Sequence, residues 1–240
     1  MLVARLRWLH RVWRYRFYVD PAGIAWIRRN VARGQYAIDI GAHKGGYTYW
    51  LARAVGPAGR VVAAEPQANL ASRLADLTQR MPQVTVHNVA VSDANGPAEI
   101  VLRSSGSSHG ASLTGWPDGD PGIRVPVMRS TLRELMATSG LSRVDFIKCD
   151  IEGHELRVLR SCGEIFERDR PVLFCECEER HRQDEDGGVQ GLVHTMAPHR
   201  YRIRFFFGRE LLDVDRFDAA KHQVVGQRAY GNNFLLEPMP

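Results

Sequence analysis

Three acidic residues stand at or near the ends of short apolar runs, where buried strands would finish. They are Asp39 in YAIDIGA, Glu65 in RVVAAEP and Asp150 in DFIKCDIEG. In an open parallel sheet, ligands bind outside the carboxyl ends of the strands, where the strand order reverses. We therefore predict that the three carboxylates converge on one crevice, because three unrelated solvated acids would rarely share this placement.

The first of these runs leads into a glycine turn that contains Gly41, Gly45 and Gly46. Glycine accepts positive φ and has no Cβ, so the backbone can approach a ligand where a strand is followed by a helix. The spacing differs from the G-x-G-x-x-G of dinucleotide sites, and Asp39 would repel a phosphate. These features favour a cationic or amine-bearing ligand such as S-adenosylmethionine, which carries a sulfonium and an ammonium group. A turn that only connects a strand to a helix is the alternative.

Two later strand ends predict contacts to an adenosine. Glu65 follows the glycine turn by about 20 residues, which is where an acid accepts hydrogen bonds from both ribose hydroxyls, and Pro66 is its neighbour. Asn88 and Ala90 lie near the end of the third predicted strand, where the adenine would lie. A solvated carboxylate at a strand end is the alternative for Glu65.

A sheet must hold these side chains, and the apolar patterns predict one. Strands are expected at residues 36–40, 60–66, 84–93, 98–104, 123–130, 146–151, 171–177, 201–207 and 232–238. Helices are expected at residues 20–34, 47–55, 69–80 and 131–140. The strands 98–104 and 123–130 should form a local hairpin.

The loop between those two strands is rich in Gly, Ser, Asp and Pro, and we place it over the active face. Long loops of this kind are commonly either functional or unstructured. Candidate substrate contacts within it are Ser107, His109, Ser112 and Trp116. A linker without contacts to substrate is the alternative.

Residues 1–34 are predicted to form a basic amphipathic helical segment in front of a domain that spans residues 35–240. The first 33 residues hold eight arginines and one acid, a net charge of +7, whereas the whole chain carries +5. A helix over residues 1–18 would place on one stripe Leu2, Leu6, Leu9, Trp13 and Phe17. We expect it to pack on its own domain, with attachment to an anionic membrane surface or a lid over the substrate as alternatives.

Length and composition narrow the class of protein. A chain of 240 residues suits one α/β domain, and no apolar run reaches the roughly 18 residues of a membrane span. The four cysteines lack C-x-x-C spacing, which predicts buried, reduced thiols in a cytoplasmic protein rather than a metal site or disulfides. Because the basic charge is confined to the N-terminal segment, we expect no nucleic-acid partner.

Five motifs, taken in order, resemble the FkbM family of S-adenosylmethionine-dependent methyltransferases. They are IDIGAHKGGYT, AAEP, HNVAVSD, DFIKCDIEGHE and PVLFCE, with a weaker match in NNFLLEP. The most specific element is K-x-D-x-E-G-x-E, which comprises Lys148, Asp150, Glu152, Gly153 and Glu155. Where family members commonly have Asn in the glycine motif, this chain has His43, so its contact to the methionine end of the cofactor stays open.

The resemblance implies an α/β class I methyltransferase fold, which is Rossmann-like. Such a fold has a seven-stranded, mostly parallel sheet with an antiparallel last strand and helices on both faces. The implied cofactor is S-adenosylmethionine, and the implied reaction is usually O-methylation of a sugar, glycolipid, polyketide or similar metabolite. The predicted cofactor site comprises Asp39, Gly41, His43, Gly45, Tyr47, Thr48, Glu65, Pro66, Asn88, Ala90 and Asp150.

The predicted catalytic residues are Asp150, Glu152 and His154. Methyl transfer to a hydroxyl requires an aligned acceptor about 3 Å from the methyl carbon, and it gains from a base that removes the proton. Histidine has the natural pKa for that role, although either carboxylate could serve. No resident metal is predicted, and a route through Mg²⁺ held by Asp150, Glu152 and Glu176 is an alternative.

Two other functions stay open. An RNA methyltransferase would use the Arg- and aromatic-rich segment, but the end of the fourth strand has neither an Asn-Pro-Pro-aromatic element nor a Pro-Cys nucleophile. A non-catalytic adenosine-nucleotide binding module would keep the crevice without turnover. The sequence does not identify the acceptor or the oligomeric state.

Overall fold

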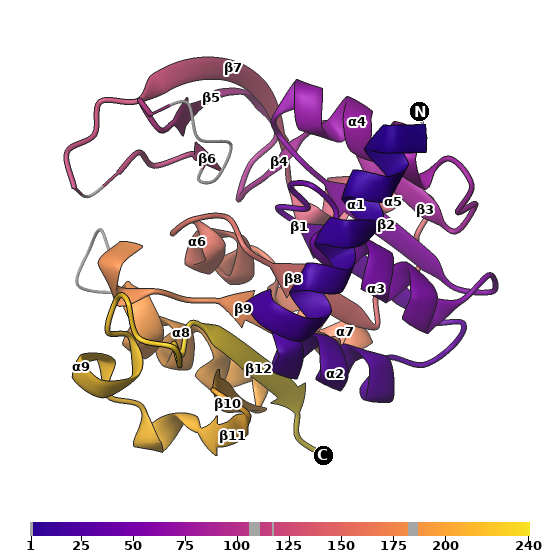
Figure 1. Ribbon diagram of the computed structural model, residues 1–240. Coiled ribbons are helices and arrows are strands. Elements are labelled where there is room, and N and C mark those ends of the chain that lie inside the picture. The colour runs from indigo at the N-terminus through magenta and orange to yellow at the C-terminus, as the bar shows by residue number, and fades with distance from the viewer. Residues whose placement is uncertain (1, 106–110, 117, 182–186) are drawn as a thin grey trace.

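The computed structural model describes residues 2–105, 111–116, 118–181 and 187–240. A twisted sheet with helices on both faces forms its centre (Figure 1). The strand order is β11-β10-β12-β9-β8-β1-β2-β3. The bounds are β1 Tyr36–Ile40, β2 Arg60–Ala64, β3 Val84–His87, β8 Phe146–Cys149, β9 Val172–Glu176, β10 Tyr201–Phe207, β11 Glu210–Asp213 and β12 Asn233–Pro238.

Five of these strands are joined by parallel pairing, and the expected fold class is confirmed. β1 pairs in parallel with β2 and β8, β2 with β3, and β8 with β9. The last strand, β12, is antiparallel to both β9 and β10, as expected. The sheet has eight strands rather than seven, because β11 pairs with β10 in an antiparallel hairpin at the edge.

A second sheet stands beside the first and has the order β4-β7-β5-β6. Its strands are β4 Ala90–Val91, β5 Gly96–Leu102, β6 Ala111–Ser112 and β7 Ile123–Ser130. The predicted hairpin is confirmed as the antiparallel pair β5–β7. The single strand predicted over 84–93 is wrong: the chain leaves the large sheet after β3, where the Asn88 amide donates to the carbonyls of Glu65 and Pro66, and then joins β7 as β4.

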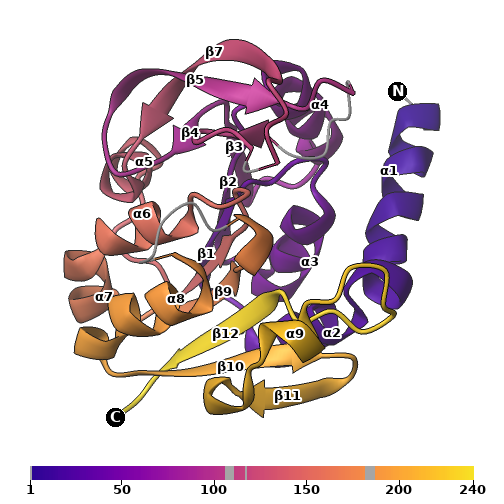
Figure 2. The same cartoon turned by 90° about the vertical axis from the view of Figure 1, so that its left-hand side faces the viewer.

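Helices α1–α4 cover one face of the large sheet and α5–α8 cover the other (Figure 2). The α-helices are α1 Leu2–Arg14, α2 Pro21–Asn30, α3 Gly46–Val55, α4 Ala68–Thr78, α5 Leu132–Thr138, α6 Glu155–Arg160, α7 Gly163–Asp169, α8 Gly188–Met196 and α9 Ala219–His222. Shorter helical turns are the π-helix Tyr15–Val19 and the 3₁₀ turns Glu179–His181, Ala197–His199 and Val214–Arg216. The helices bury both faces of the parallel strands, as the continuous apolar runs of those strands require.

The N-terminal segment packs on its own domain, but not through the predicted stripe. Trp8 and Val12 are the buried residues of α1, whereas Leu6, Trp13 and Phe17 are 57%, 43% and 55% exposed. The Trp8 indole donates to the Lys44 carbonyl over 3.0 Å, and the Trp50 indole of α3 donates to the Val12 carbonyl over 2.8 Å. These hydrogen bonds turn the other face of α1 inward. Leu6, Trp13 and Phe17 of the predicted stripe are therefore exposed, whereas Leu9 is partly buried against the same cluster as Trp8 and Val12.

All four cysteines are buried free thiols, as predicted. Within the described residues, no helix is long and apolar enough to cross a membrane.

Candidate active site

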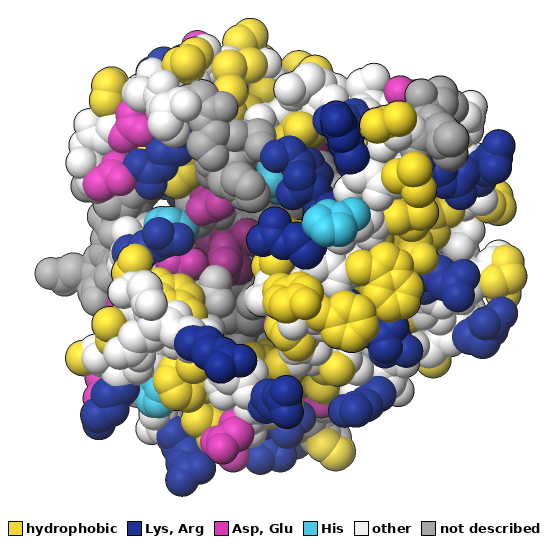
Figure 3. Space-filling view, in the orientation of Figure 1, with side chains coloured by type: hydrophobic (Ala, Val, Ile, Leu, Met, Phe, Trp, Pro, Cys, Tyr) yellow, Lys and Arg dark blue, Asp and Glu magenta, His cyan; other side chains and the backbone are white. Residues whose placement is uncertain are grey.

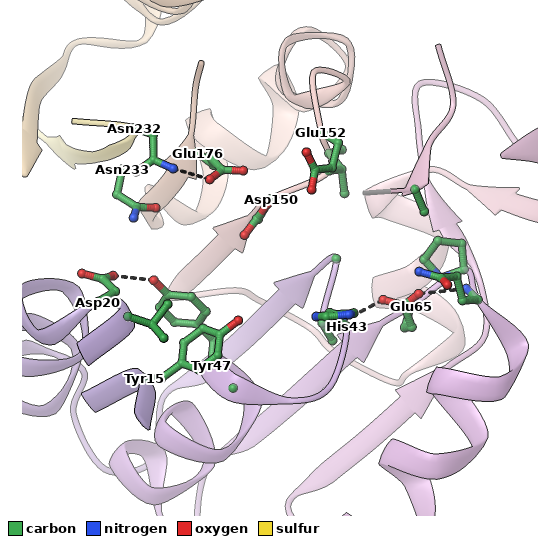
Figure 4. Close-up of a pocket in the computed structure, with 18 residues that line it drawn as sticks. Tyr15, Asp20, His43, Tyr47, Glu65, Asp150, Glu152, Glu176, Asn232 and Asn233 are labelled. Atoms are coloured by element: carbon green, nitrogen blue, oxygen red, sulfur yellow. Dashed lines mark hydrogen bonds between the residues drawn. The ribbon is translucent and has the colours of Figure 1, made fainter. Parts of the chain in front are cut away.

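The carboxyl ends of β1, β2, β8 and β9 open on a cavity of about 280 Å³ (Figure 4). Strand ends supply Gly41, Glu65, Asp150 and Glu176 to its wall. Of the three acids predicted to converge here, Glu65 and Asp150 line the cavity and Asp39 does not. Five carboxyl groups line it: Asp20, Glu65, Asp150, Glu152 and Glu176. Such a lining favours a ligand that carries positive charge.

The predicted site residues divide into two groups by their positions. Those that line the cavity are Gly41, His43, Tyr47, Glu65, Pro66, Asp150 and Glu152. Those that do not are Asp39, Gly45, Thr48, Asn88, Ala90 and His154. The second group lies behind the wall or on neighbouring elements, where its members hold the lining residues in place or pack in the core.

The glycine turn after β1 lies in close contact with the end of β8. Gly41 has φ +78°, and a Cβ built on it would lie 1.9 Å from the Asp150 carbonyl oxygen. His43 is a non-glycine residue in the left-handed region, with φ +49°. That conformation is most often taken by Gly, Asn, Asp and His. The backbone conformation therefore accounts for a histidine at this position of the glycine turn.

Glu65 is held by the backbone. One carboxylate oxygen accepts from the N–H of His43 over 2.7 Å, and the other accepts from the N–H of Gln67 over 2.9 Å. Burial raises the pKa of Glu65 to about 7 despite these two hydrogen bonds. An ionised carboxylate has about four acceptor positions. The other two positions have no hydrogen-bond donor among the described residues, which matches a ligand with two adjacent hydroxyls.

Asp39 lies behind the cavity wall. Its carboxylate accepts from the Thr48 hydroxyl over 2.5 Å, and both residues are buried. Burial raises the pKa of Asp39 to about 6, although the Thr48 hydrogen bond and the Lys148 charge oppose this change. The pair joins β1 to the first turn of α3, so in this structure it fixes the geometry of the glycine turn.

The opposite end of the cavity is a network of side chains. The Lys148 ammonium lies 3.0 Å from an Asp150 oxygen and is buried, whereas the Asp150 side chain is partly exposed to the cavity. Burial opposes both charges, but their attraction raises the pKa of Lys148 and lowers that of Asp150. Burial and the Asp150 charge raise the pKa of Glu176 well above its usual range. The Asn232 amide donates to Glu176, which completes the network.

Glu152 faces the cavity from the turn that follows β8 (Figure 4). It has φ +57°, an uncommon conformation for a glutamate, and Gly153 continues the turn with φ +95°. Burial raises its pKa to about 7, and the charges of Asp150 and Glu178 add to the effect. The His181 ring nitrogen lies 3.6 Å from its carboxylate. Backbone strain at a residue that faces a cavity is common in functional sites.

His154 has another environment. Its Nε2 lies 2.9 Å from the Ser92 hydroxyl, and the side chain is buried. Burial lowers its pKa to about 4. A neutral imidazole held against Ser92 is turned away from the cavity that Asp150 and Glu152 line.

Sequence reasoning missed a part of the cavity that comes from the N-terminal segment. Tyr15 and Val19 of the π-helix and Asp20 line it. Asp20 caps α2 by accepting from the Gly23 N–H over 2.9 Å, and it also accepts from the Tyr47 hydroxyl. The aromatic side chain at 15 and the acid at 20 gave no separate signal, because their placement depends on how α1 packs.

The loop between β5 and β7 contributes Ala111 to the cavity. The Ser112 hydroxyl donates to the Glu152 carbonyl over 3.3 Å, and Trp116 is buried beneath the Arg103 guanidinium, 3.8 Å from the ring centre. Ser107 and His109 lie outside the described residues. Asn232 and Asn233, just before and at the start of β12, also line the cavity, and the sequence analysis did not single them out.

The residues present fit S-adenosylmethionine. The acids suit its sulfonium and ammonium, the open acceptor positions on Glu65 suit its ribose, and the glycine turn keeps the wall close to the backbone. Among the described residues, no cluster of three or more His, Cys, Asp or Glu side chains is arranged to hold a metal ion.

Comparison with known proteins supports this assignment. The model of the methyltransferase FkbM domain matches residues 39–213. An FkbM methyltransferase from Methylobacillus flagellatus KT superposes with a TM-score of 0.55 at 15% identity, over 97% of this chain and 54% of that one. This chain therefore spans about half the length of that relative. No curated protein matches the sequence.

Two further solved structures share the fold. A proposed rRNA methylase from Clostridium thermocellum has a TM-score of 0.52 at 9% identity, over 93% of this chain and 97% of that one. A proposed O-methyltransferase from Klebsiella pneumoniae has a TM-score of 0.50 at 15% identity, over 98% and 90%. The family match covers most of the chain, so the protein belongs to the FkbM methyltransferase family.

Proposed function

We propose that the enzyme methylates a hydroxyl group of a sugar, glycolipid, polyketide or similar metabolite. The observation that carries the proposal is Glu152, a carboxyl group that faces the cavity and has a pKa raised to about 7. A neutral hydroxyl is a weak nucleophile, and a base whose pKa lies near the working pH accelerates its attack by roughly 10²- to 10⁴-fold. Asp150 stands beside Glu152 in the lining but is held ionised by Lys148.

The cofactor would bind in the part of the cavity at the carboxyl ends of β1 and β2. Glu65 would accept from the ribose hydroxyls, and the turn from Gly41 to His43 would lie against the methionine part. The bound cofactor supplies an electrophilic methyl group on a sulfonium. The acids around that position, above all Asp150, lower the energy of a cationic ligand.

In the proposed mechanism, Glu152 removes the acceptor's proton. Its carboxylate takes the hydroxyl proton as the oxygen attacks, and water accepts that proton after the product leaves. Asp150 orients the hydroxyl, because Lys148 and the hydrogen-bonded Glu176 fix its position. Correct alignment of the acceptor oxygen can supply on the order of 7–11 kcal/mol of the barrier reduction.

Glu152→Gln tests the assignment. Below pH 7 most Glu152 is protonated and cannot act as a base, so wild-type turnover should rise with pH and level off above about 7. The variant should be about 10²- to 10⁴-fold slower and lose this limb of the pH profile. Turnover is measured with labelled S-adenosylmethionine and a panel of hydroxylated metabolites.

His154→Gln is the matched control, because His154 lies outside the cavity. It should keep the wild-type pH profile once its thermal stability has been checked. A flat wild-type profile, or one that only His154→Gln abolishes, would remove Glu152 from the role of base. Methyl transfer to bulk RNA alone would favour the RNA methyltransferase, and tight S-adenosylhomocysteine binding without any transfer would favour a binding module.

We also propose that the enzyme contacts an anionic membrane surface through its N-terminal segment. Of the ten large hydrophobic residues that are exposed in the described chain, six lie between residues 3 and 19. They are Val3, Leu6, Trp13, Phe17, Tyr18 and Val19. Apolar and aromatic side chains next to arginines suit the interface of an anionic bilayer, and the segment carries a net charge of +7.

Trp13→Ser combined with Phe17→Ser should weaken this contact. The two rings stack with centroids 5.8 Å apart and are both exposed, so their loss should reduce binding with little change in folding. Pelleting with phosphatidylglycerol vesicles should fall about tenfold or more, and phosphatidylcholine vesicles should bind poorly from the start. The control Ile123→Ser with Met128→Ser removes two exposed apolar residues elsewhere. An equal loss in the control would contradict a specific surface.

A further inference from the structure

A groove of about 660 Å³ runs along α1 beside the cavity. Tyr15 and Val19 line both hollows, so the groove begins where the cavity wall ends. The rest of its lining comes from α1: Leu6, Arg7, His10, Arg11 and Arg14. A ligand that extends out of the cavity past the π-helix would lie along these side chains.

The groove continues on the far side of Arg7 and Arg11. There, a second hollow of about 210 Å³ is lined by both arginines together with Lys44 and Arg73, over a floor of leucines and Trp8. No Asp or Glu is among the described residues that line either hollow. The lining thus changes from acidic side chains in the cavity to basic side chains in the groove, on either side of the shared residues Tyr15 and Val19.

The three arginines of the groove along α1 carry their charges without acidic partners in the part of the chain that the structure describes. Among the described residues, no ion pair involves Arg7, Arg11 or Arg14. Burial lowers the pKa of Lys44, and the charges of Arg11 and Arg73 lower it further, so these cations repel one another. An anion placed among them would relieve that repulsion.

The basic side chains can also be followed on the surface. Figure 3 shows a hollow that contains acidic side chains, with basic side chains along its border over α1. Arginine guanidinium groups present several N–H donors in one plane and bind phosphate oxygens in pairs. Three arginines along one groove therefore match a phosphate or diphosphate better than a single carboxylate.

We propose that the groove along α1 is a binding site for a phosphate or diphosphate group of the acceptor, whose hydroxyl end enters the acidic cavity. The proposal rests on the proposed hydroxyl methylation and gives its substrate class, an anionic phosphorylated molecule with a free hydroxyl. The phosphate could belong to a soluble sugar phosphate or to a lipid headgroup. Both present the same chemistry to Arg7, Arg11 and Arg14.

Calorimetry with inorganic pyrophosphate tests the groove without any need for turnover. The variant that combines Arg11→Gln with Arg14→Gln should weaken pyrophosphate binding about tenfold or more. Arg29→Gln is the matched control, because Arg29 is an exposed arginine of the same segment that lines neither hollow. It should change the affinity less than about twofold.

S-adenosylhomocysteine binding provides the second readout. The double variant should bind it as the wild type does, which shows that the fold and the cavity are intact. The proposal would be overturned if the double variant kept the wild-type affinity for pyrophosphate. It would also be overturned if Arg29→Gln reduced that affinity as much as the double variant does. Intact pyrophosphate binding together with no methyl transfer to any hydroxyl would refute the proposed function and leave the anion site standing.

Vesicles distinguish the two sources of phosphate. If the double variant also loses binding to phosphatidylglycerol vesicles while Arg29→Gln retains it, the groove takes a lipid headgroup. If the double variant loses pyrophosphate binding alone, the groove takes a soluble phosphorylated acceptor. Competition between bulk RNA and pyrophosphate is the last check. If RNA displaces pyrophosphate far more strongly than an equal concentration of phosphate groups should, the result contradicts a small-molecule or lipid acceptor.

Discussion

The two ends of the acidic cavity are built in different ways. At one end, the Glu65 carboxylate accepts hydrogen bonds from the backbone N–H groups of His43 and Gln67. At the other end, Asp150 pairs with a buried lysine, and Glu176 accepts from a side-chain amide. We call these the backbone-held end and the side-chain-held end.

The difference affects how each end responds to change. Backbone N–H groups keep their position whatever the side chains are, so the backbone-held end depends mainly on the glycine turn. At the side-chain-held end, the charges affect one another: the Lys148 charge lowers the pKa of Asp150, and burial together with the Asp150 charge raises the pKa of Glu176. One substitution there should change several groups at once.

Gly41→Ala should have the largest effect, because Gly41 lies where the two ends meet. The new Cβ would lie 1.9 Å from the Asp150 carbonyl oxygen in a residue with φ +78°, so β1 and β8 would have to separate. We expect a loss of stability above about 3 kcal/mol and no measurable S-adenosylhomocysteine binding, checked by urea unfolding and calorimetry.

Gly34→Ala is the control for backbone strain. Gly34 has φ +85°, but a Cβ there would meet nothing within 4 Å. Its cost should be about 1 kcal/mol, from the left-handed conformation alone. Similar losses in the two variants would show that strain, and not contact between the strand ends, decides the outcome.

Asp150→Asn should strongly disturb the side-chain-held end. It removes the carboxylate that pairs with the buried Lys148 ammonium over 3.0 Å, and removal of one partner of a buried pair typically costs about 3–5 kcal/mol. Because the Asp150 side chain is partly open to the cavity, we expect a value near about 3 kcal/mol by urea unfolding, together with loss of turnover.

Adding Lys148→Met to Asp150→Asn separates the two roles of Asp150. The double variant removes the unpaired charge, so stability should recover while turnover stays lost. Recovery of both would mean that Asp150 serves only as a counter-ion.

Glu65→Gln should have the smallest effect on the fold and act on the backbone-held end alone. The neutral amide loses charge-assisted hydrogen bonds of about 1.5–3 kcal/mol, which corresponds to roughly ten- to hundredfold weaker S-adenosylhomocysteine binding. Since the pKa of Glu65 is about 7, wild-type affinity should fall as the pH is lowered through 7, whereas the variant should show no such change. Calorimetry at several pH values measures the affinity and its pH dependence. If the affinity of the variant changed with pH as the wild-type affinity does, Glu65 would be excluded as the titrating group.

The same contrast explains how much could be predicted from sequence. The backbone-held end comes from contiguous motifs, so its strand, glycine turn and acid were found in order, along with the parallel sheet. Glu176 follows the same rule of strand ends and was considered only as a metal ligand. His43 was unexplained because sequence shows residue types, whereas the positive φ of that position appears only in the folded backbone.

The parts that sequence did not predict depend on packing between distant segments. Periodicity identified α1 as amphipathic, but two of its faces are apolar, and the indole hydrogen bonds of Trp8 and Trp50 decide which face is buried. The contribution of Tyr15 and Asp20 to the cavity follows from that choice. The position of His154 likewise depends on Ser92, which is 62 residues away in the chain.

The five-residue π-helix has a thermodynamic consequence. Tyr15 and Val19 form a wall that the cavity and the groove share, and the Tyr15 ring contacts the ring of Tyr47 at 5.6 Å. A ligand that shifts this wall in one hollow changes the shape of the other. Linkage makes such coupling reciprocal. If an anion bound along α1 changes the affinity of the cavity for its ligand by some factor, a ligand bound in the cavity changes the affinity of the groove for the anion by the same factor.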